Sequence, residues 1–172
     1  MSNLDRENLE LKAYARDLGE SRRRLVAAAI PRLGLEHQRD YYLVVGEQRV
    51  KIRIIDDTHA FLIPYQRANT RNAKASRYRL QELSCTEALA TVANAEVLTT
   101  VIKQREIFLY AGNTRIHLDQ VEGLGEFIEF EYLIRYGDEA EWLQAHKTLE
   151  YLTELLAIAP QDCLAGSYSD LL

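Results

Sequence analysis

Charged residues at every second position, repeated along successive strand-like segments, most limit how this chain folds. Side chains two residues apart project from the same face of a strand, so each such pair charges one face. The opposite faces are apolar, as in Leu9 and Leu11 or Ile52 and Ile54. The charged positions are Glu10 and Lys12, Lys51 and Arg53, Arg67, Lys103 and Arg105, Arg115 and Asp119, and Glu129 and Glu131.

Turn and capping signals divide the chain into strands and helices. The alternating segments predict strands over residues 8–14, 38–45, 49–55, 60–67, 76–83, 98–110, 114–121 and 126–134. Capping pairs predict three helices, at Asp17 with Glu20, Ser84 with Glu87 and Asp138 with Glu141. Pro31 and Gly34 are expected to close the first helix after Ile30. The order predicts one α+β domain over residues 1–172, built on a mostly antiparallel sheet.

The charged faces fit two architectures. A half-solvated antiparallel sheet is the common one. Such a surface normally mixes in Thr, Ser and Gln, however, and here nearly every position carries a formal charge. About eight strands also suffice to close a barrel whose interior holds side chains or one small ligand. We therefore expect a closed eight-stranded antiparallel barrel with helices packed outside and charges inside.

A charged interior of this composition predicts an anionic ligand and a metal ion. Seven cations against four carboxylates leave an excess of positive charge, which a polyphosphate would neutralise. Carboxylates do not bind phosphate directly, but they are the oxygen ligands that Mg²⁺ or Mn²⁺ prefers. Together they favour chemistry on a phosphate ester or anhydride.

The overall charge limits the partners. Formal net charge is −5, from 21 Lys and Arg against 26 Asp and Glu, which argues against nucleic acid polymers and against polybasic membrane contact. The longest apolar run, Leu25 to Ile30, is too short to span a membrane, and no signal peptide is recognised. Cys85 and Cys163 form no CxxC pair, so a reducing cytoplasmic location is expected.

Residues 114–131, TRIHLDQVEGLGEFIEFE, resemble the late-strand pattern of the CYTH superfamily, the triphosphate tunnel metalloenzymes named for class IV adenylate cyclase and thiamine triphosphatase. Residues 8–12, NLELK, are similar to that family's Glu-x-Glu-x-Lys signature. The segments around Lys51, Arg67 and Lys103 and the SYSDLL ending also fit. The resemblance implies an eight-stranded tunnel that binds a triphosphate and one or two divalent ions.

By position, the resemblance assigns roles to individual residues. It implies metal binding by Glu10, Asp119, Glu129 and Glu131, and places Glu10, Lys12 and Asp119 at the catalytic centre. It implies phosphate binding by Lys12, Lys51, Arg53, Arg67, Lys103, Arg105 and Arg115.

The sequence departs from the family pattern at two points. Asn8 replaces the first Glu of the signature, which removes a negative charge from the metal region. The resulting Asn-x-Glu-x-Lys segment is similar to that of bacterial members called class IV cyclases. Ser76, Arg77 and Tyr78 stand where many members have an Arg-x-Glu strand. His117 shares a face with Arg115 and Asp119, either as a hydrogen-bonded structural histidine or as a proton shuttle.

A basic segment over residues 68–75 is expected to form a loop. The basic residues in and next to this loop form either an ordinary solvated surface or a cover over bound phosphates. They are Arg71, Lys74, Arg77 and Arg79.

Three functions remain open. A class IV adenylate cyclase-like enzyme would convert ATP to cyclic AMP and pyrophosphate, and the subgroup resemblance favours it. A triphosphatase would hydrolyse tripolyphosphate, thiamine triphosphate or a nucleoside triphosphate. A binding protein would keep the tunnel without turnover. The expected cofactor is Mg²⁺ or Mn²⁺, and the protein is expected to be a monomer or homodimer.

Overall fold

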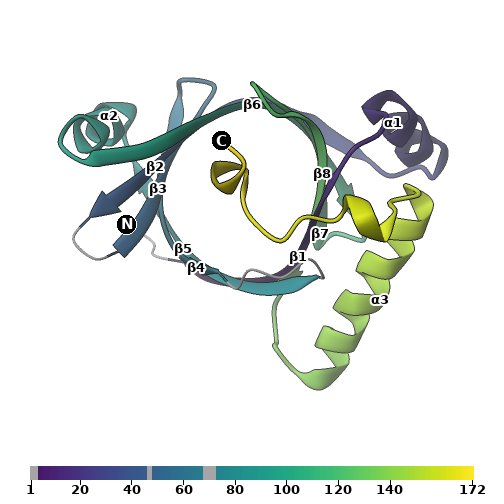
Figure 1. Cartoon of the computed structure of the whole chain (residues 1–172). Coiled ribbons are helices and arrows are strands. Elements are labelled where there is room, and N and C mark those ends of the chain that lie inside the picture. Colours follow the sequence, from purple (N-terminus) through teal and green to yellow (C-terminus); the bar gives the residue numbers. More distant parts are fainter. Residues whose placement is uncertain (1–3, 46–47, 68–72) are drawn as a thin grey trace.

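The computed structural model describes residues 4–45, 48–67 and 73–172. Over these residues eight antiparallel strands close into a barrel in the order β1-β5-β4-β3-β2-β6-β7-β8, which confirms the predicted fold class (Figure 1). The strands are β1 (Leu4–Tyr14), β2 (Arg32–Val45), β3 (Gln48–Ile55), β4 (His59–Arg67), β5 (Lys74–Leu83), β6 (Glu96–Tyr110), β7 (Thr114–Val121) and β8 (Gly125–Ile134).

Helices lie outside the barrel, as the sequence predicts. Viewed along the barrel axis, α1 (Leu18–Ala27) and α3 (Glu139–Leu155) flank β7 and β8, and α2 (Cys85–Ala93) lies on the opposite side (Figure 1). The capping signals are confirmed, because Asp17, Ser84 and Asp138 each accept a hydrogen bond from the backbone N–H three residues on. No helix among the described residues combines the length and apolar character needed to cross a membrane.

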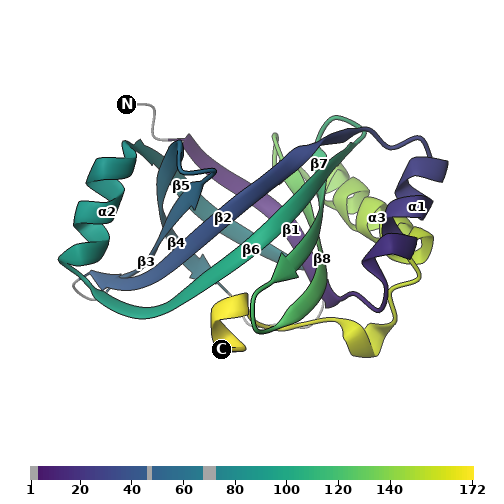
Figure 2. The ribbon, with the colours of Figure 1, turned by 90° about the horizontal axis from the view of Figure 1, so that it is seen from above.

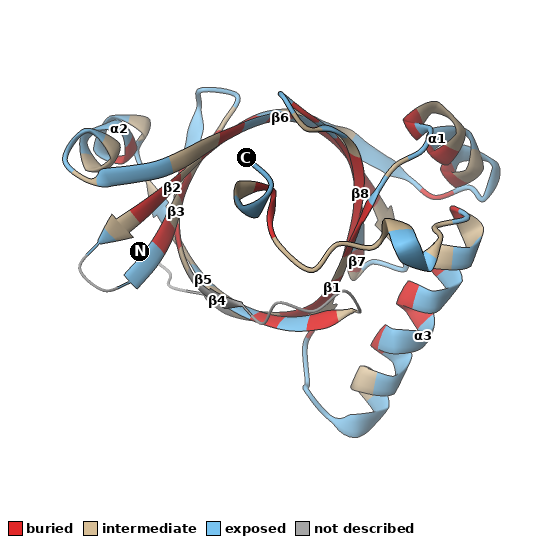
Figure 3. Cartoon of the chain, viewed as in Figure 1, coloured by how far each residue is buried: buried red, intermediate tan, exposed pale blue. Residues whose placement is uncertain are grey.

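The outer faces of the strands form the hydrophobic core together with the helices. Ile116, Ile128 and Phe130 pack with Leu149 and Leu152 of α3 and with residues of α1. A second cluster joins Leu43, Ile52, Ile54 and Ala60 to Ala88 of α2. The buried face of α3 therefore points towards the barrel and its exposed face towards solvent (Figure 3). This arrangement leaves the charged strand faces to line the lumen.

Several elements differ in length from the prediction. Helix α1 ends at Ala27 rather than Ile30, because Ala29 takes a positive φ of 56° and Ile30 N–H bonds back to Leu25. Strand β2 begins at Arg32 rather than at residue 38. An irregularity in its register with β6 near Gly34 lets the strand include this glycine, which was expected to lie at the end of the first helix. Strand β5 begins at Lys74, which places part of the predicted loop within a strand.

The C-terminal segment crosses one mouth of the barrel. It runs from α3 through the short 3₁₀ helices η1 (Pro160–Asp162) and η2 (Tyr168–Asp170), and both views place η2 at that mouth (Figures 1 and 2). The Leu164 N–H donates to the Lys12 carbonyl at 2.8 Å. Tyr168 packs with Tyr42, Val101, Val121 and Phe127 in an apolar cluster. The tail therefore packs against the side of this mouth formed by β2, β6, β7 and β8.

The outer core generates a stability prediction. Replacing fully buried Leu152 with Ala should lower the free energy of unfolding by about 2–5 kcal/mol, because it leaves a cavity between α3 and the barrel. Leu143 on the same helix is 56% exposed, so its replacement with Ala should change stability by only about 0.5 kcal/mol. Urea denaturation of both variants checks this; equal effects would contradict the assignment of the core.

Candidate active site

A cavity of about 350 Å³ occupies the barrel interior and receives side chains from every strand. Most of the predicted functional residues share it. Its lining includes Glu10, Lys12, Lys51, Arg53, Lys103, Arg105, Arg115, Glu129 and Glu131. Asp119 is fully buried and bonds to Arg105, a lining residue. The Arg67 side chain lies outside the described part of the chain, so its predicted contact with phosphate remains a prediction.

Asp40 organises the cations on one wall and was missed by the sequence analysis. Arg53 donates to both of its carboxylate oxygens at 2.7 Å, and Lys103 donates to one at 2.8 Å. Lys51 Nζ lies 3.8 Å from the same carboxylate. Burial opposes ionisation, but the charges of Arg53, Lys103 and Lys51 hold the pKa of Asp40 well below its usual range. One fully buried anion thus holds three cations together.

The two lysines of this group are poised to lose their protons near neutral pH. Burial, reinforced by the charge of Arg53, lowers the pKa of Lys51 to about 7. Burial also lowers the pKa of Lys103 to about 8, although Asp40 opposes the shift. A bound polyanion would favour the charged ammonium in both cases, so anion binding and protonation are coupled.

Arg105 is fixed by a second buried network. Its guanidinium donates to both oxygens of Asp119, at 2.8 and 2.7 Å, and to Glu129 at 2.6 Å. The Tyr168 hydroxyl donates to Asp119 at 2.6 Å, while Lys12 Nζ lies 4.0 Å from the centre of the Tyr168 ring. Asp119 therefore uses its oxygens to orient Arg105 and Tyr168, in a position predicted to be that of a metal ligand.

Carboxylates gather where β1, β7 and β8 adjoin. Glu10 lies directly opposite Glu131 in the register, and Lys12 opposite Glu129. His117 lies opposite Glu129 on the other side of β8. Burial would raise the pKa of Glu129, but Lys12 and Arg105 outweigh it and hold the pKa well below its usual range. Neighbouring like charges such as Glu10 and Glu131 are stabilised when a cation lies between them.

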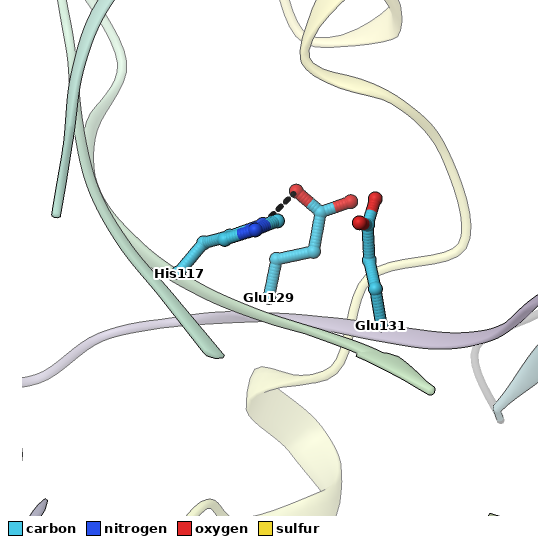
Figure 4. Close-up of side chains that lie close together, drawn as sticks. All are labelled: His117, Glu129 and Glu131. Carbon is cyan, nitrogen blue, oxygen red and sulfur yellow. Dashed lines mark ion pairs between the residues drawn. The ribbon is translucent and has the colours of Figure 1, made fainter. Parts of the chain in front are cut away.

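The geometry fits a divalent ion at this corner. One ligand atom from each of His117, Glu129 and Glu131 lies within 4.8 Å of the other two. The three side chains extend to the same side of β7 and β8, with their polar ends close together (Figure 4). Glu10 reaches the same cavity from the adjacent strand. The carboxylate oxygens are ligands that Mg²⁺ and Mn²⁺ both accept, and an imidazole nitrogen is a ligand for transition metals.

A scan against family models matches residues 7–163 to the CYTH domain. The chain belongs to the CYTH domain family. The match covers both the Asn8 to Lys12 segment and the strand segment 114–131 on which the resemblance was based.

Solved structures share the CYTH fold of this chain. A protein from Pyrococcus horikoshii superimposes with a TM-score of 0.78 at 20% identity, covering 96% of this chain and 99% of that one. A proposed adenylate cyclase from Vibrio parahaemolyticus gives 0.76 at 20% identity, covering 95% and 96%. A proposed adenylyl cyclase from Hippeastrum, with a dominant triphosphatase activity, gives 0.62 at 14% identity, covering 88% of each chain. No curated protein sequence matches this chain at a significant level.

The basic segment near residue 74 does not supply a cover over this CYTH cavity through its described residues. Lys74 is buried and donates to the Ala165 carbonyl, which ties β5 to the C-terminal segment. Arg77 is exposed on the outer face of β5 and pairs with Glu7 at 3.0 Å. Arg79 lies on the same outer face. Arg71 lies outside the described residues.

Aromatic and aliphatic side chains complete the cavity wall. The apolar and aromatic part of the lining comes from β3, β4 and β5, through Ile55, Phe61, Ile63, Tyr78 and Leu80. Burial and the charge of Glu131 raise the pKa of Tyr78 to about 12, so its phenol stays neutral. The CYTH cavity thus combines a charged side with a side suited to an apolar group.

Removing the buried anion should destabilise the protein. Asp40→Asn leaves Arg53, Lys103 and Lys51 without their shared counterion, which should reduce the free energy of unfolding by about 3–5 kcal/mol. Added tripolyphosphate should restore part of the loss. Asp57→Asn removes an exposed pair with Arg39 and should cost no more than about 1 kcal/mol. Thermal denaturation of both variants measures the difference; equal stability would contradict the role of Asp40.

Binding of a triphosphate should take up protons from solution. At pH 8, Lys51 with its pKa of about 7 is mostly neutral, and a bound anion raises that pKa, so uptake of about one proton is expected. Calorimetry with tripolyphosphate in buffers of different ionisation enthalpy measures this number. Lys51→Met should reduce it; proton release by the wild-type protein would show that the lysine is already charged.

Proposed function

We propose that this CYTH protein is a divalent-metal-dependent enzyme that acts on a nucleoside triphosphate, with an adenylate cyclase-like reaction that converts ATP to 3′,5′-cyclic AMP and pyrophosphate. The observation that carries the proposal is the placement of an organised cation group beside a cluster of carboxylates within one cavity. Such a combination can hold a polyphosphate and its metal together.

The cations of the cavity hold the triphosphate. Arg53 and Arg105 present guanidinium groups that are already oriented by Asp40 and Asp119, so little side-chain entropy is lost when phosphate binds. Lys12, Lys51 and Lys103 add ammonium donors, and Arg115 lies opposite Glu131 in the register. In this proposal Asp119 is a positioning residue for Arg105 rather than a metal ligand.

Glu10, Glu129 and Glu131 would hold Mg²⁺ or Mn²⁺. Such an ion, when bound, neutralises phosphate charge and makes a nearby hydroxyl more acidic. The protein itself orients the triphosphate so that the ribose 3′-hydroxyl, giving its proton to water, attacks the α-phosphorus while the bond from that phosphorus to the bridging oxygen of the departing pyrophosphate breaks. Lys12 and Arg105 then stabilise the charge that accumulates on departing pyrophosphate.

The apolar wall supports a nucleotide rather than inorganic tripolyphosphate as the substrate. Phe61 and Tyr78 offer ring surfaces, and Ile55 and Leu80 extend the apolar area beside the cations. A purine base and ribose could rest there, whereas tripolyphosphate has no apolar part to contact it.

A triphosphatase is the second candidate. The same cations and carboxylates can serve a water molecule that attacks a terminal phosphorus, and the structurally similar Hippeastrum protein has a dominant triphosphatase activity. A protein that binds triphosphate without turnover is the third candidate, because Asn8 removes one carboxylate that the family signature supplies.

A product assay with ATP and with tripolyphosphate, each with Mg²⁺ and Mn²⁺, separates these functions. Cyclic AMP together with pyrophosphate supports the proposal. Orthophosphate release without cyclic AMP establishes the triphosphatase, and tight binding of ATP without any product establishes the binding protein.

The carboxylates of β8 should be required for turnover. The double variant Glu129→Gln/Glu131→Gln should lose metal-dependent activity by at least about 100-fold, because the neutral amides no longer attract the divalent ion. Glu150→Gln/Glu154→Gln makes the same change on the exposed surface of α3 and should keep full activity. Initial rates measure both, and wild-type activity in the β8 variant would exclude the metal assignment.

A further inference from the structure

We propose that His117 is a nitrogen ligand of the metal ion and that it makes the site select Mn²⁺ over Mg²⁺. The inference rests on the proposed function, since it concerns the metal of the same cavity. Metal binding by His117 is a third role, different from a structural hydrogen bond and from a proton shuttle.

His117 is buried in the barrel wall, and one of its ring nitrogens makes no hydrogen bond of normal length. Its side chain projects from β7 into the cavity and the residue is only 2% exposed. Among the described residues, no atom lies within hydrogen-bonding geometry of Nδ1; its nearest partner is Glu129 Oε2, at the ion-pair distance of 3.7 Å. A buried polar atom without a close hydrogen bond is costly, and coordination to a metal ion would satisfy it.

The surrounding ligand atoms are spaced close to what a metal ligand shell requires. Ligand atoms about 2.0–2.2 Å from one ion stand at most about 4.4 Å apart. One atom each from His117, Glu129 and Glu131 lies within 4.8 Å of the others, so a small side-chain adjustment brings all three to an ion. All three come from adjacent strands of a closed barrel, which keeps the backbone of the cluster in place (Figure 4).

A nitrogen ligand changes which ion is preferred. Mg²⁺ demands near-ideal octahedral oxygen coordination and gives up its waters reluctantly. Imidazole suits transition metals, and Mn²⁺ also accepts the carboxylates of Glu129 and Glu131. A site of one imidazole and two carboxylates should therefore bind Mn²⁺ more tightly than Mg²⁺, and the difference should depend on the histidine.

Metal titration of the metal-free full chain tests the preference. His117→Gln should weaken Mn²⁺ binding by about tenfold or more, while Mg²⁺ binding changes by less than about threefold. His146→Gln makes the same substitution on the exposed face of α3 and should leave both affinities unchanged. Equal loss for both ions in His117→Gln, or no loss for Mn²⁺, would overturn the proposal.

Pulsed electron paramagnetic resonance of Mn²⁺ bound to the wild-type protein gives an answer that does not depend on a folded variant. Hyperfine coupling to nitrogen, altered by labelling histidine with ¹⁵N, would establish the imidazole ligand. Bound Mn²⁺ with no nitrogen coupling would overturn it.

These measurements separate the inference from the proposed function. Nitrogen coupling in a protein that yields no product from ATP or tripolyphosphate supports the ligand and rejects the enzyme. Turnover by a protein whose Mn²⁺ shows only oxygen ligands supports the enzyme and rejects the histidine.

Discussion

The shared ion pairing of Asp40 with Arg53, Lys103 and Lys51 is the interaction on which the interior depends. Closing the sheet removes the charged strand faces from bulk water, where like charges would otherwise be screened. Asp40 compensates the cations of one wall, and Asp119 with Glu129 compensates Arg105 on the other. Without these anions a folded barrel would confine several positive charges in a space of about 350 Å³. The same anions hold the guanidinium groups in fixed orientations.

The sequence predicted the barrel and most of its lining because both follow from alternation. Once the apolar face of a strand such as β3 is assigned to the outer core, Lys51 and Arg53 must point inward. Asp40 was missed because its neighbours on the same face of β2 include Gln38 and Tyr42, which do not form a charged pair. Tyr168 could not be predicted to contact Asp119, since 49 residues separate them and a non-repetitive tail brings them together.

Helix ends were predicted less well because the usual residue signal is missing. Helices are commonly followed by a glycine in the left-handed conformation, but two residues beyond the last residue of α1 and of α3 that position is held by Ala29 and Ala157, at φ 56° and 51°. Ile30 and Ile158 then bond back to Leu25 and Thr153. Alanine is a strong helix former, so its presence predicts that the helix continues. In the structure, the turn at Ala29 instead places the Ile30 side chain in the core.

The C-terminal tail also makes the two ends of the cavity different. Tyr168 and its apolar neighbours cover one side of the mouth, near Tyr42 and Val121. In the β2–β3 register, Lys51 lies opposite Tyr42 whereas Ile55 lies opposite Gln38, so the apolar wall extends away from the mouth that Tyr168 covers. A nucleoside triphosphate that binds phosphate-first would place its charged end among the organised cations and its base against this wall. Under the proposed function, the tail, far from the charged strand pairs in sequence, would determine which end of the substrate faces the metal ligands.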